Sequence, residues 1–316
     1  MKKGLALLLG CLLMAACGEG PRGIIFDTDW WTDVDDCCAL RTMLEEEKEG
    51  RIELLGVCLS AVNETSVASL SSFLGNEGRK GMPLGADKLA TDHGGEPVWH
   101  EAAMAGCPQR EAETVDDVED CVEFYRRTLS QARGKVDIVT VGFPNAVARL
   151  LESGPDKYSR LSGEELVRKK VRHLWMMAGQ YPEGREYNFA NSARSREAGA
   201  LICSRWPTEI TFLGFEVGIE VVIGGGLPEE DLIHKIFTAY GCADGRYAWD
   251  PLTVWMACLG SPEAAGFDAV RGTVTLDPAT GVNHFTPSAD GPHRYVRMLH
   301  DSAWYAAQFR PILGEQ

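Results

Sequence analysis

Short apolar runs alternate along the chain with longer segments whose apolar residues recur at helical spacing. The apolar runs cover 24–26, 52–59, 136–141, 171–178 and 209–213. Their composition is typical of buried strands, and the periodic segments between them are typical of helices. Because strands alternate with helices, we expect a single α/β domain of Rossmann-like type, with a mostly parallel sheet flanked by helices.

Helical periodicity predicts helices at 37–50, 66–74, 114–129, 145–153, 195–203, 228–240, 251–259 and 301–309. Short strands are predicted at 82–85, 272–276 and 294–299, the last two as a hairpin. The segment 86–113 is predicted to be a loop, and its length is typical of functional loops. Parallel sheets bind ligands beyond the carboxyl ends of their strands. Polar residues that directly follow a predicted strand are therefore the candidate site.

The first residues are typical of an export signal, with two lysines, the apolar run Leu5–Leu13 and small residues before Cys17. This arrangement resembles a bacterial lipoprotein signal, in which residues 1–16 are removed and Cys17 carries a lipid. Residues 17–22 would then be a short tether and residues 23–316 the α/β domain. The alternative is an ordinary signal peptide with an incidental cysteine. The apolar run is shorter than the roughly 20 residues that span a bilayer.

The composition limits the kinds of partner and cofactor that the protein is expected to bind. The formal net charge is −15 and the pI about 5.0, which argues against nucleic-acid binding, because such binding depends on cationic contacts to phosphates. The ten cysteines show no paired spacing of a zinc site. Most of those after the signal lie in apolar stretches, and we interpret them as small buried hydrophobic residues. Export would permit disulfides, but their pairing cannot be read from the sequence.

An acidic segment follows the first predicted strand directly. Asp27, Asp29, Asp33, Asp35 and Asp36 come within ten residues of one another. Carboxylates crowded at the end of a buried strand repel one another unless a proton or cation neutralises them. Oxygen ligands suit Ca²⁺ or Mg²⁺. The alternative is a solvated acidic turn that caps a helix.

The segment DTDWWTDVDD resembles the amino-terminal signature of the inosine-uridine-preferring nucleoside hydrolases, DxDPGxDDA. Both the DxD and the DD are present here. Trp30 and Trp31 replace Pro-Gly, and two extra residues precede Asp35 and Asp36. The match is therefore altered in the loop between the two acidic pairs.

Two later segments are similar to the same family. Asp250 before a proline resembles its carboxyl-terminal calcium signature, although Trp249 stands where the family often has His. In the loop after 171–178, Glu186 and Asn188 match residues that bind ribose hydroxyls in the family. Gln180 stands where the family has an Asn, which keeps the amide group.

Three weaker matches complete the resemblance. Val141 corresponds to a residue whose backbone carbonyl binds calcium. Asn63 corresponds to an Asn near the metal and sugar, but an isolated Asn is equally typical of a turn. His93 corresponds to a His in the loop over the base, although an exposed loop His would fit as well. The matches extend from Asp27 to Asp250 in the family's order.

The resemblance implies a nucleoside-hydrolase-like domain that hydrolyses the N-glycosidic bond of ribonucleosides with Ca²⁺, releasing free base and ribose. Asp29, Asp36, the Val141 carbonyl and Asp250 would bind calcium, and Asp29 would also be the catalytic base. Asp27 would not bind the metal itself but would orient the acidic loop that carries the ligands. A small nucleoside or other ribosyl compound would be the substrate, and a homodimer or homotetramer is expected.

The implied substrate-binding residues are Asp35, Asn63, His93, Gln180, Glu186, Asn188 and Trp249. With Trp249 in place of His, the group that protonates the leaving base is not identified. The tryptophans at 30, 31 and 249 would either stack on the base or pack in the core.

Two other functions are compatible with parts of the sequence. A haloacid-dehalogenase-like phosphatase also opens with an apolar strand and DxD. Asp27 would then be the nucleophile and Asp29 the acid/base with Mg²⁺, but the segments near Glu186 and Asp250 would have no role. The other alternative is a lipoprotein that binds calcium and a ribosyl ligand without turnover. The protein is in each case expected to be exported and lipid-anchored to the cell envelope.

Overall fold

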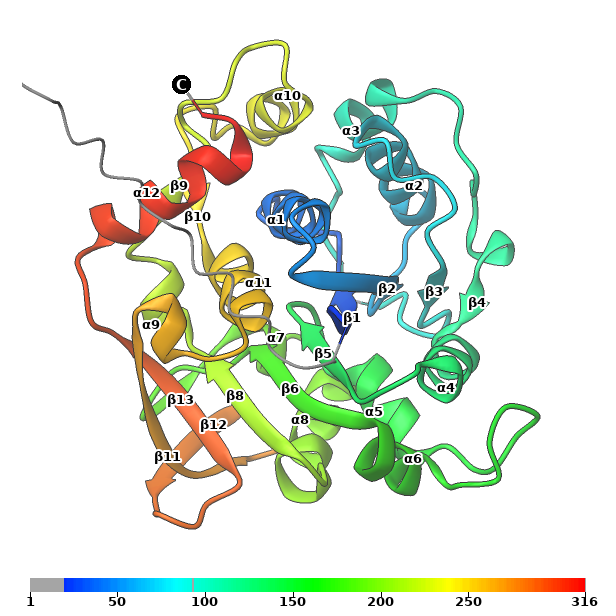
Figure 1. The fold of residues 1–316 in the computed structure, drawn as a ribbon, viewed down its shortest axis with the longest axis vertical. Helices are drawn as coiled ribbons and strands as arrows, with labels where there is room; N and C mark the ends of the chain where they lie inside the picture. The colour runs from blue at the N-terminus through cyan, green and yellow to red at the C-terminus, as the bar shows by residue number, and fades with distance from the viewer. Residues whose placement is uncertain (1–19, 93, 316) are drawn as a thin grey trace, which may run out of the picture.

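The computed structural model describes residues 20–92 and 94–315. The predicted signal with Cys17, and His93, lie outside the described residues. Within the described part, eleven strands form one sheet and a two-stranded ribbon stands apart. Helices cover both faces of the sheet (Figure 1). The predicted α/β domain with a mostly parallel sheet is therefore confirmed.

The sheet is parallel across its centre and antiparallel at one side. In spatial order its strands are β4 (Glu119–Asp120), β3 (Leu84–Ala86), β2 (Ile52–Leu59), β1 (Arg22–Thr28), β5 (Val136–Thr140), β6 (Val171–Met177), β8 (Glu209–Leu213), β13 (His293–Met298), β11 (Phe267–Leu276), β12 (Val282–Pro287) and β7 (Glu183–Arg185). Strands β4 to β13 in this order are parallel neighbours, and the remaining pairs are antiparallel.

Two helical layers bury the two faces of this sheet. One layer contains α1 (Asp36–Lys48), α2 (Ser66–Asn76), α3 (His100–Gly106), α10 (Leu232–Tyr240), α11 (Trp249–Leu259) and α12 (Ser302–Leu313). The other contains α4 (Cys121–Gln131), α5 (Asn145–Glu152), α6 (Gly163–Lys170) and α8 (Ala193–Arg205). Alternation along β1 explains the two cores, because Ile24 and Phe26 belong to the first and Ile25 to the second. Such two-sided burial is typical of parallel strands.

Short elements lie around the loops. They are α7 (Tyr187–Ala190), α9 (Phe215–Gly218), the ribbon of β9 (Val222–Ile223) and β10 (Arg246–Tyr247), and the 3₁₀ turns Val115–Asp117 and Glu263–Ala265.

The sequence missed several elements. The predicted loop 86–113 contains helix α3, and the loop after β6 contains β7 and α7. The two predicted late strands do pair antiparallel, but β11 begins at Phe267 and β12 lies between them in sequence. These segments were missed because they are short, so they show too few periods to separate from loops.

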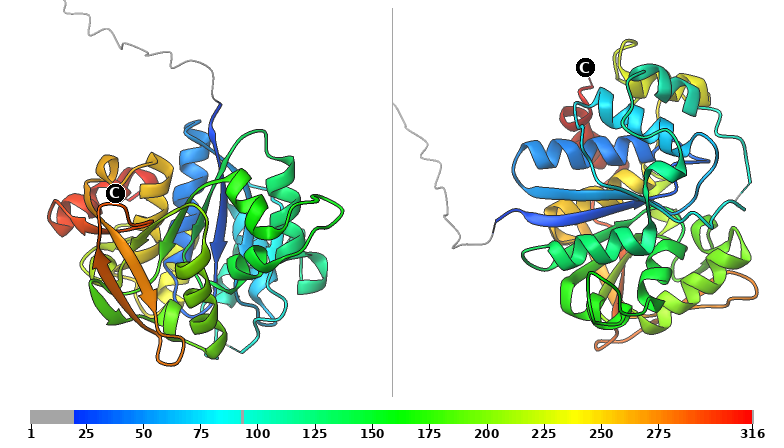
Figure 2. Two further views of the ribbon diagram at one scale, coloured as in Figure 1. Left: turned by 90° about the horizontal axis from the view of Figure 1, so that it is seen from below. Right: turned by 90° about the vertical axis from the view of Figure 1, so that its right-hand side faces the viewer.

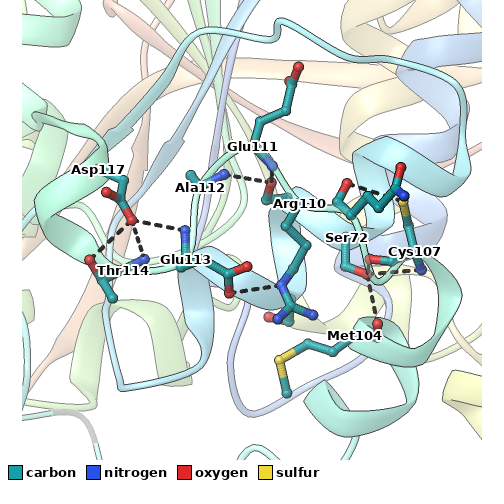
Figure 3. Close-up of polar contacts among 12 residues, drawn as sticks. Ser72, Met104, Cys107, Arg110, Glu111, Ala112, Glu113, Thr114 and Asp117 are labelled. Carbon is teal, nitrogen blue, oxygen red and sulfur yellow. Dashed lines mark hydrogen bonds and ion pairs between the residues drawn. The ribbon is translucent and has the colours of Figure 1, made fainter.

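The segment after β3 is tied to α2 by serine hydroxyls (Figure 3). The Cys107 amide donates to the Ser72 hydroxyl at 3.1 Å, and the Glu111 amide donates to the Ser71 hydroxyl at 3.0 Å. Thr114 then caps the following turn in a reciprocal bond with Asp117. Together with the packing of α2 on α3, these bonds hold the end of α3 and the segment that follows it against α2.

Two further features concern the chain as described. None of its helices has both the length and the apolar character needed to cross a membrane. None of the cysteines in the described residues forms a disulfide, and all of them are buried except Cys107 and Cys242, which are half-buried. This agrees with their interpretation as small hydrophobic residues.

Candidate active site

The order of the strands changes direction at the end of β1. Strand β1 has β2 on one side and β5 on the other, so the chain leaves it in opposite directions at this point. Ligands of open parallel sheets bind at such a reversal, beyond the carboxyl ends of the strands. Asp27 and Thr28 close β1 there, and the predicted acidic segment follows.

Asp27 is the second-last residue of β1 and is fully buried. The Tyr125 hydroxyl donates to its carboxylate at 2.6 Å and the Thr140 hydroxyl at 3.1 Å. Burial raises the pKa of Asp27 to about 7. Both oxygens therefore serve to join β1, β5 and α4 beneath the site.

Three other carboxylates lie close together. Asp35, Asp36 and Asp250 each place an oxygen within 4.8 Å of the others, and all three are buried. The Asp250 amide donates to Asp35 at 3.0 Å, which joins the start of α11 to the start of α1. Burial, followed by repulsion from neighbouring aspartates, raises the pKa of Asp35 and of Asp250. Such a group must hold protons or bind a cation.

Asp29 lies at the edge of this cluster and is slightly exposed. Its carboxylate accepts a hydrogen bond from the Trp31 amide at 3.2 Å. Burial and then the charge of Asp36 raise the pKa of Asp29. Asp36 itself accepts from the Thr28 hydroxyl and from the Trp30 amide. The loop backbone thus fixes both carboxylates toward the same space.

The donor set fits a hard divalent cation. All side-chain donors are carboxylate oxygens, the type that Ca²⁺ and Mg²⁺ prefer. No Lys or Arg of the described residues forms an ion pair with Asp29, Asp35, Asp36 or Asp250. The charge of Arg246 offsets only part of the rise in the pKa of Asp35.

The Val141 carbonyl lies directly after the end of β5, the strand next to β1. It accepts a hydrogen bond from the Asn188 amide at 2.7 Å, and a carbonyl has a second lone pair to offer. Gly142 permits the close approach, because a Cβ there would lie 2.3 Å from the Asp29 amide nitrogen. The structure thus brings Asp35, Asp36 and Asp250 into one group. Asp29 is near enough to Asp36 to feel its charge, and Val141 precedes the glycine that contacts the Asp29 backbone.

The predicted ribose-binding residues lie at the start of α7. Glu186 caps this helix, accepting from the Asn188 amide at 2.6 Å and the Gly179 amide at 2.9 Å. Burial raises its pKa to about 7. The Asn188 side chain donates to Val141 and to the Met177 carbonyl at 2.9 Å. Both side chains are therefore rigidly held between β5 and β6, beside the acidic group.

Gln180 follows β6 and Asn63 follows β2, and β1 and β5 lie between these two strands. The Gln180 side chain packs against Gly184, where a Cβ would lie 2.6 Å from its amide oxygen. The Asn63 oxygen accepts from the Thr65 amide at 2.9 Å, as in a turn. Its side-chain nitrogen is buried and has no hydrogen-bond partner in the part of the chain that the structure describes. Asn63 is thus a turn residue whose side-chain amide nitrogen has an unused capacity to donate a hydrogen bond within the described residues.

The two tryptophans of the altered loop pack inward. Trp30 is fully buried and packs edge-on against Phe73 and Trp99. It adopts φ +47°, which is strained for a side chain of this kind. Trp31 is also buried, and its indole donates to the Gly95 carbonyl at 2.8 Å. Trp30 therefore belongs to the core and is not available to stack on a base.

Trp249 borders the site within an aromatic group. Its ring stacks on Phe215 with 5.5 Å between centroids, and its indole donates to the Phe215 carbonyl at 2.9 Å. The Arg246 guanidinium lies 5.4 Å from the Trp249 ring and binds Asp33 through two hydrogen bonds. This ion pair joins the acidic loop to β10, 213 residues later in sequence.

Sequence reasoning missed three residues of this region. His100 donates its Nε2–H to the Trp30 carbonyl at 2.8 Å, and burial lowers its pKa to about 4, so it is neutral. Arg246 anchors Asp33, and Tyr187 is half-exposed beside Phe143. Tyr187 could have been found from the sequence, because it stands between the matched Glu186 and Asn188. No sequence pattern pointed to His100 or Arg246.

Comparison with known proteins gives structural matches only. No protein-family model and no curated protein sequence matches the chain. The structure is similar to a plant nucleoside hydrolase (TM-score 0.70, 16% identity, covering 93% of this chain and 99% of the other). It is also similar to the inosine-uridine preferring nucleoside hydrolase of Bacillus anthracis (TM-score 0.67, 16% identity, 92% and 99%).

A type III effector protein, XopQ, complexed with adenosine diphosphate ribose, matches as well (TM-score 0.62, 14% identity, 94% and 92%). Matches over nearly the whole of both chains establish a common architecture, whereas identities this low carry no activity across. The chain has the fold of the nucleoside hydrolases.

Proposed function

We propose that the protein is an N-ribosyl hydrolase that cleaves the N-glycosidic bond of ribonucleosides with Ca²⁺. The observation that carries the proposal is the buried group of Asp35, Asp36 and Asp250, next to Asp29, at the strand reversal of a nucleoside hydrolase fold. Buried carboxylates without a cation of the protein are costly. A metal-dependent reaction gives them a role.

Asp29, Asp36, Asp250 and the Val141 carbonyl would hold the metal, and Asp35 lies close enough to contribute. When bound, the cation would supply the positive charge that makes a nearby water molecule a better nucleophile. Asp29 is the least enclosed side chain of the four carboxylates. It would accept the proton of the attacking water as general base.

The sugar would be held by groups from three strand ends. The buried Asn63 nitrogen lacks a partner among the described residues, so a ribose hydroxyl would satisfy it. Glu186, Asn188, Gln180 and Asp35 would contact the other hydroxyls. Such hydrogen bonds orient the sugar and strengthen as charge develops on it.

The leaving base would lie among aromatic side chains. Trp249 is nearly buried, whereas its stacking partner Phe215 is 37% exposed and Tyr187 is 49% exposed. Exposed aromatic faces next to a sugar site favour a flat heterocycle. We propose that these two rings contact the base and that Trp249 supports Phe215 from behind. His93 would act from the loop above the base.

The test is a nucleoside panel. The chain starting after Cys17 is incubated with purine and pyrimidine nucleosides, and free base is measured by chromatography with and without a chelator. We expect base release that stops with chelator and returns with Ca²⁺. No release from any nucleoside would contradict the proposal.

The alternative of a ligand-binding protein without turnover has one supporting observation. XopQ, with a similar fold, is described with adenosine diphosphate ribose bound, and the loop here is strained at Trp30. In that case calcium raises the melting temperature while the panel yields no base. The phosphatase alternative is disfavoured, because its nucleophile Asp27 is fully buried and bonded to Tyr125 and Thr140.

Localisation and assembly are proposed from the sequence. The protein would be exported and anchored to the bacterial cell envelope through a lipid on Cys17, and it would form a homodimer or homotetramer. Incorporation of labelled fatty acid that is lost in Cys17→Ser tests the anchor. Sedimentation of the soluble chain tests the assembly.

A further inference from the structure

The sheet edge opposite the acidic site is lined with cations. The central strands β2, β1, β5 and β6 are parallel neighbours, so their amino ends meet at one edge. Basic residues stand at or next to each of these ends: Arg51, Arg22, Arg133, Lys135, Lys169, Lys170 and Arg172. We call these seven residues the basic edge.

Backbone contacts hold several of these cations side by side. The Lys170 ammonium donates to the Ala132 carbonyl at 2.7 Å, and the Arg172 guanidinium donates to the Lys135 carbonyl at 2.9 Å. A cavity of about 970 Å³ opens at this edge. Its charged lining residues are Arg22, Glu53, Arg127, Arg133, Lys135 and Arg172. Five cations thus face one carboxylate across this cavity.

Part of this positive charge is not compensated. Arg51 pairs with Glu46 and Glu49. Arg127 pairs with Glu119, and Arg172 pairs with Asp137 at 3.3 Å. Among the described residues, by contrast, no carboxylate forms an ion pair with Arg133, Lys135 or Lys169. A patch of this sign is unexpected in a chain of net charge −15, which indicates a specific anionic partner.

The position of the chain start suggests which partner this is. Gly20 and Pro21, the first described residues, line the same cavity as Arg133. The amino end of β1 lies at the margin of the molecule (Figure 2). If Cys17 carries a lipid, as the sequence predicts, the basic edge lies within a few residues of the bilayer.

We propose that the basic edge docks on the anionic headgroups of a lipid bilayer. Strand β1 has seven residues and therefore separates this edge from the acidic site by roughly 20 Å. That distance exceeds the screening length of about 8 Å at physiological salt, so the acidic site does not cancel the attraction. Docking in this orientation turns the carboxyl ends of the strands, with the candidate site, away from the membrane.

The docking surface is independent of the proposed reaction and is tested without it. The unlipidated chain from residue 18, which contains the whole described domain, is sedimented with vesicles of phosphatidylcholine, with or without phosphatidylglycerol. We expect binding only to the vesicles that contain phosphatidylglycerol, and weaker binding as salt is raised. Binding to both kinds, or to neither, would overturn the proposal.

Matched variants locate the surface. The triple variant Arg133→Gln, Lys135→Gln and Lys169→Gln should bind on the order of 100-fold more weakly, because each cation near an anionic bilayer contributes about fivefold. The control changes Lys88, Lys235 and Arg310 to Gln, which alters net charge equally but lies outside the basic edge, and should bind as the parent does. Equal losses in both triples would contradict the assignment.

Folding is checked by melting temperature in every variant. If the triple variant is not folded, the single variant Arg133→Glu replaces it, and unchanged binding by a folded Arg133→Glu chain would overturn the proposal. Binding to heparin but not to the anionic vesicles would also overturn it, since a lipid surface is the stated partner.

Discussion

At the scale of single residues, the site consists of buried acids whose protonation is shifted by their surroundings. Burial raises the pKa of Asp36 and of Glu186 to about 7. Asp36 has three other aspartates nearby, whereas Glu186 accepts backbone hydrogen bonds at a helix start. The first arrangement stores negative charge for a cation, and the second holds a carboxylate rigidly.

Replacing the proposed base should abolish turnover while preserving the fold. We expect Asp29→Asn to lower kcat by about 10²- to 10⁴-fold, the usual contribution of a general base. The control is Asp268→Asn, which removes an exposed partner of Arg297. Base release under saturating substrate is the measurement. An Asp29→Asn chain with parental kcat would exclude the assigned role.

Glu186 makes a prediction about stability and pH. Its folded-state pKa of about 7 exceeds the ordinary value of 4.5 for a glutamate, so the folded state binds more protons between these values. The free energy of unfolding contributed by Glu186 therefore decreases as pH rises from about 4.5 to 7, by at most about 3 kcal/mol. Urea unfolding in chelator should show a smaller decrease in Glu186→Gln over this range. Parallel curves would contradict the shift.

At the scale of elements, the altered loop after β1 is supported from two distant segments. Helix α3 supplies His100, which bonds the Trp30 carbonyl, and Trp99, whose indole donates to the Trp31 carbonyl at 3.0 Å. On the other side, Arg246 of β10 binds Asp33. The loop that carries the carboxylates is thus clamped between parts of the chain that follow other strands.

The clamp is tested by a double-mutant cycle. Asp33→Asn and Arg246→Gln should each raise KM for the nucleoside more than they lower kcat, because the pair positions the loop and does not touch the reacting atoms. The pair is partly exposed, so we expect a coupling energy of up to about 1 kcal/mol in stability. Additive effects on KM would show that the two residues act separately.

At the scale of the whole molecule, one edge of the sheet is acidic and the opposite edge is basic. The acidic edge gathers Asp35, Asp36 and Asp250 from segments that only the fold brings together. A divalent cation bound there would link α1 to α11, and we expect it to stabilise the whole domain, because it would bind the folded chain alone.

Calcium binding should therefore raise the melting temperature, and acid should oppose it. Protonated carboxylates do not bind metal, so below pH 7, the approximate pKa of Asp36, affinity should fall about tenfold per pH unit for each proton released. Calorimetry between pH 6 and 8 measures this. Asp250→Asn should lose most of the shift in melting temperature. An equal shift in that variant would place the metal elsewhere.

The sequence by itself determined the layer architecture and the acidic strand end. The run 24–26 predicts a strand that is buried on both faces, because its consecutive side chains are all apolar. Aspartates that directly follow such a run must lie at the carboxyl edge. For this reason the positions of Asp29 and Asp36 followed from spacing, whereas Asp250 stands at a helix start and was assigned only through the family resemblance.

Only the tertiary structure decided what surrounds those residues. Asp33 meets Arg246 across 213 residues, and His100 meets Trp30 across 70, which no local pattern reveals. It also decided that Trp30 packs in the core while Phe215 and Tyr187 remain partly exposed. The physical reason is that periodicity reports burial against the chain's own sheet, whereas partners, cavities and edges depend on how distant segments pack.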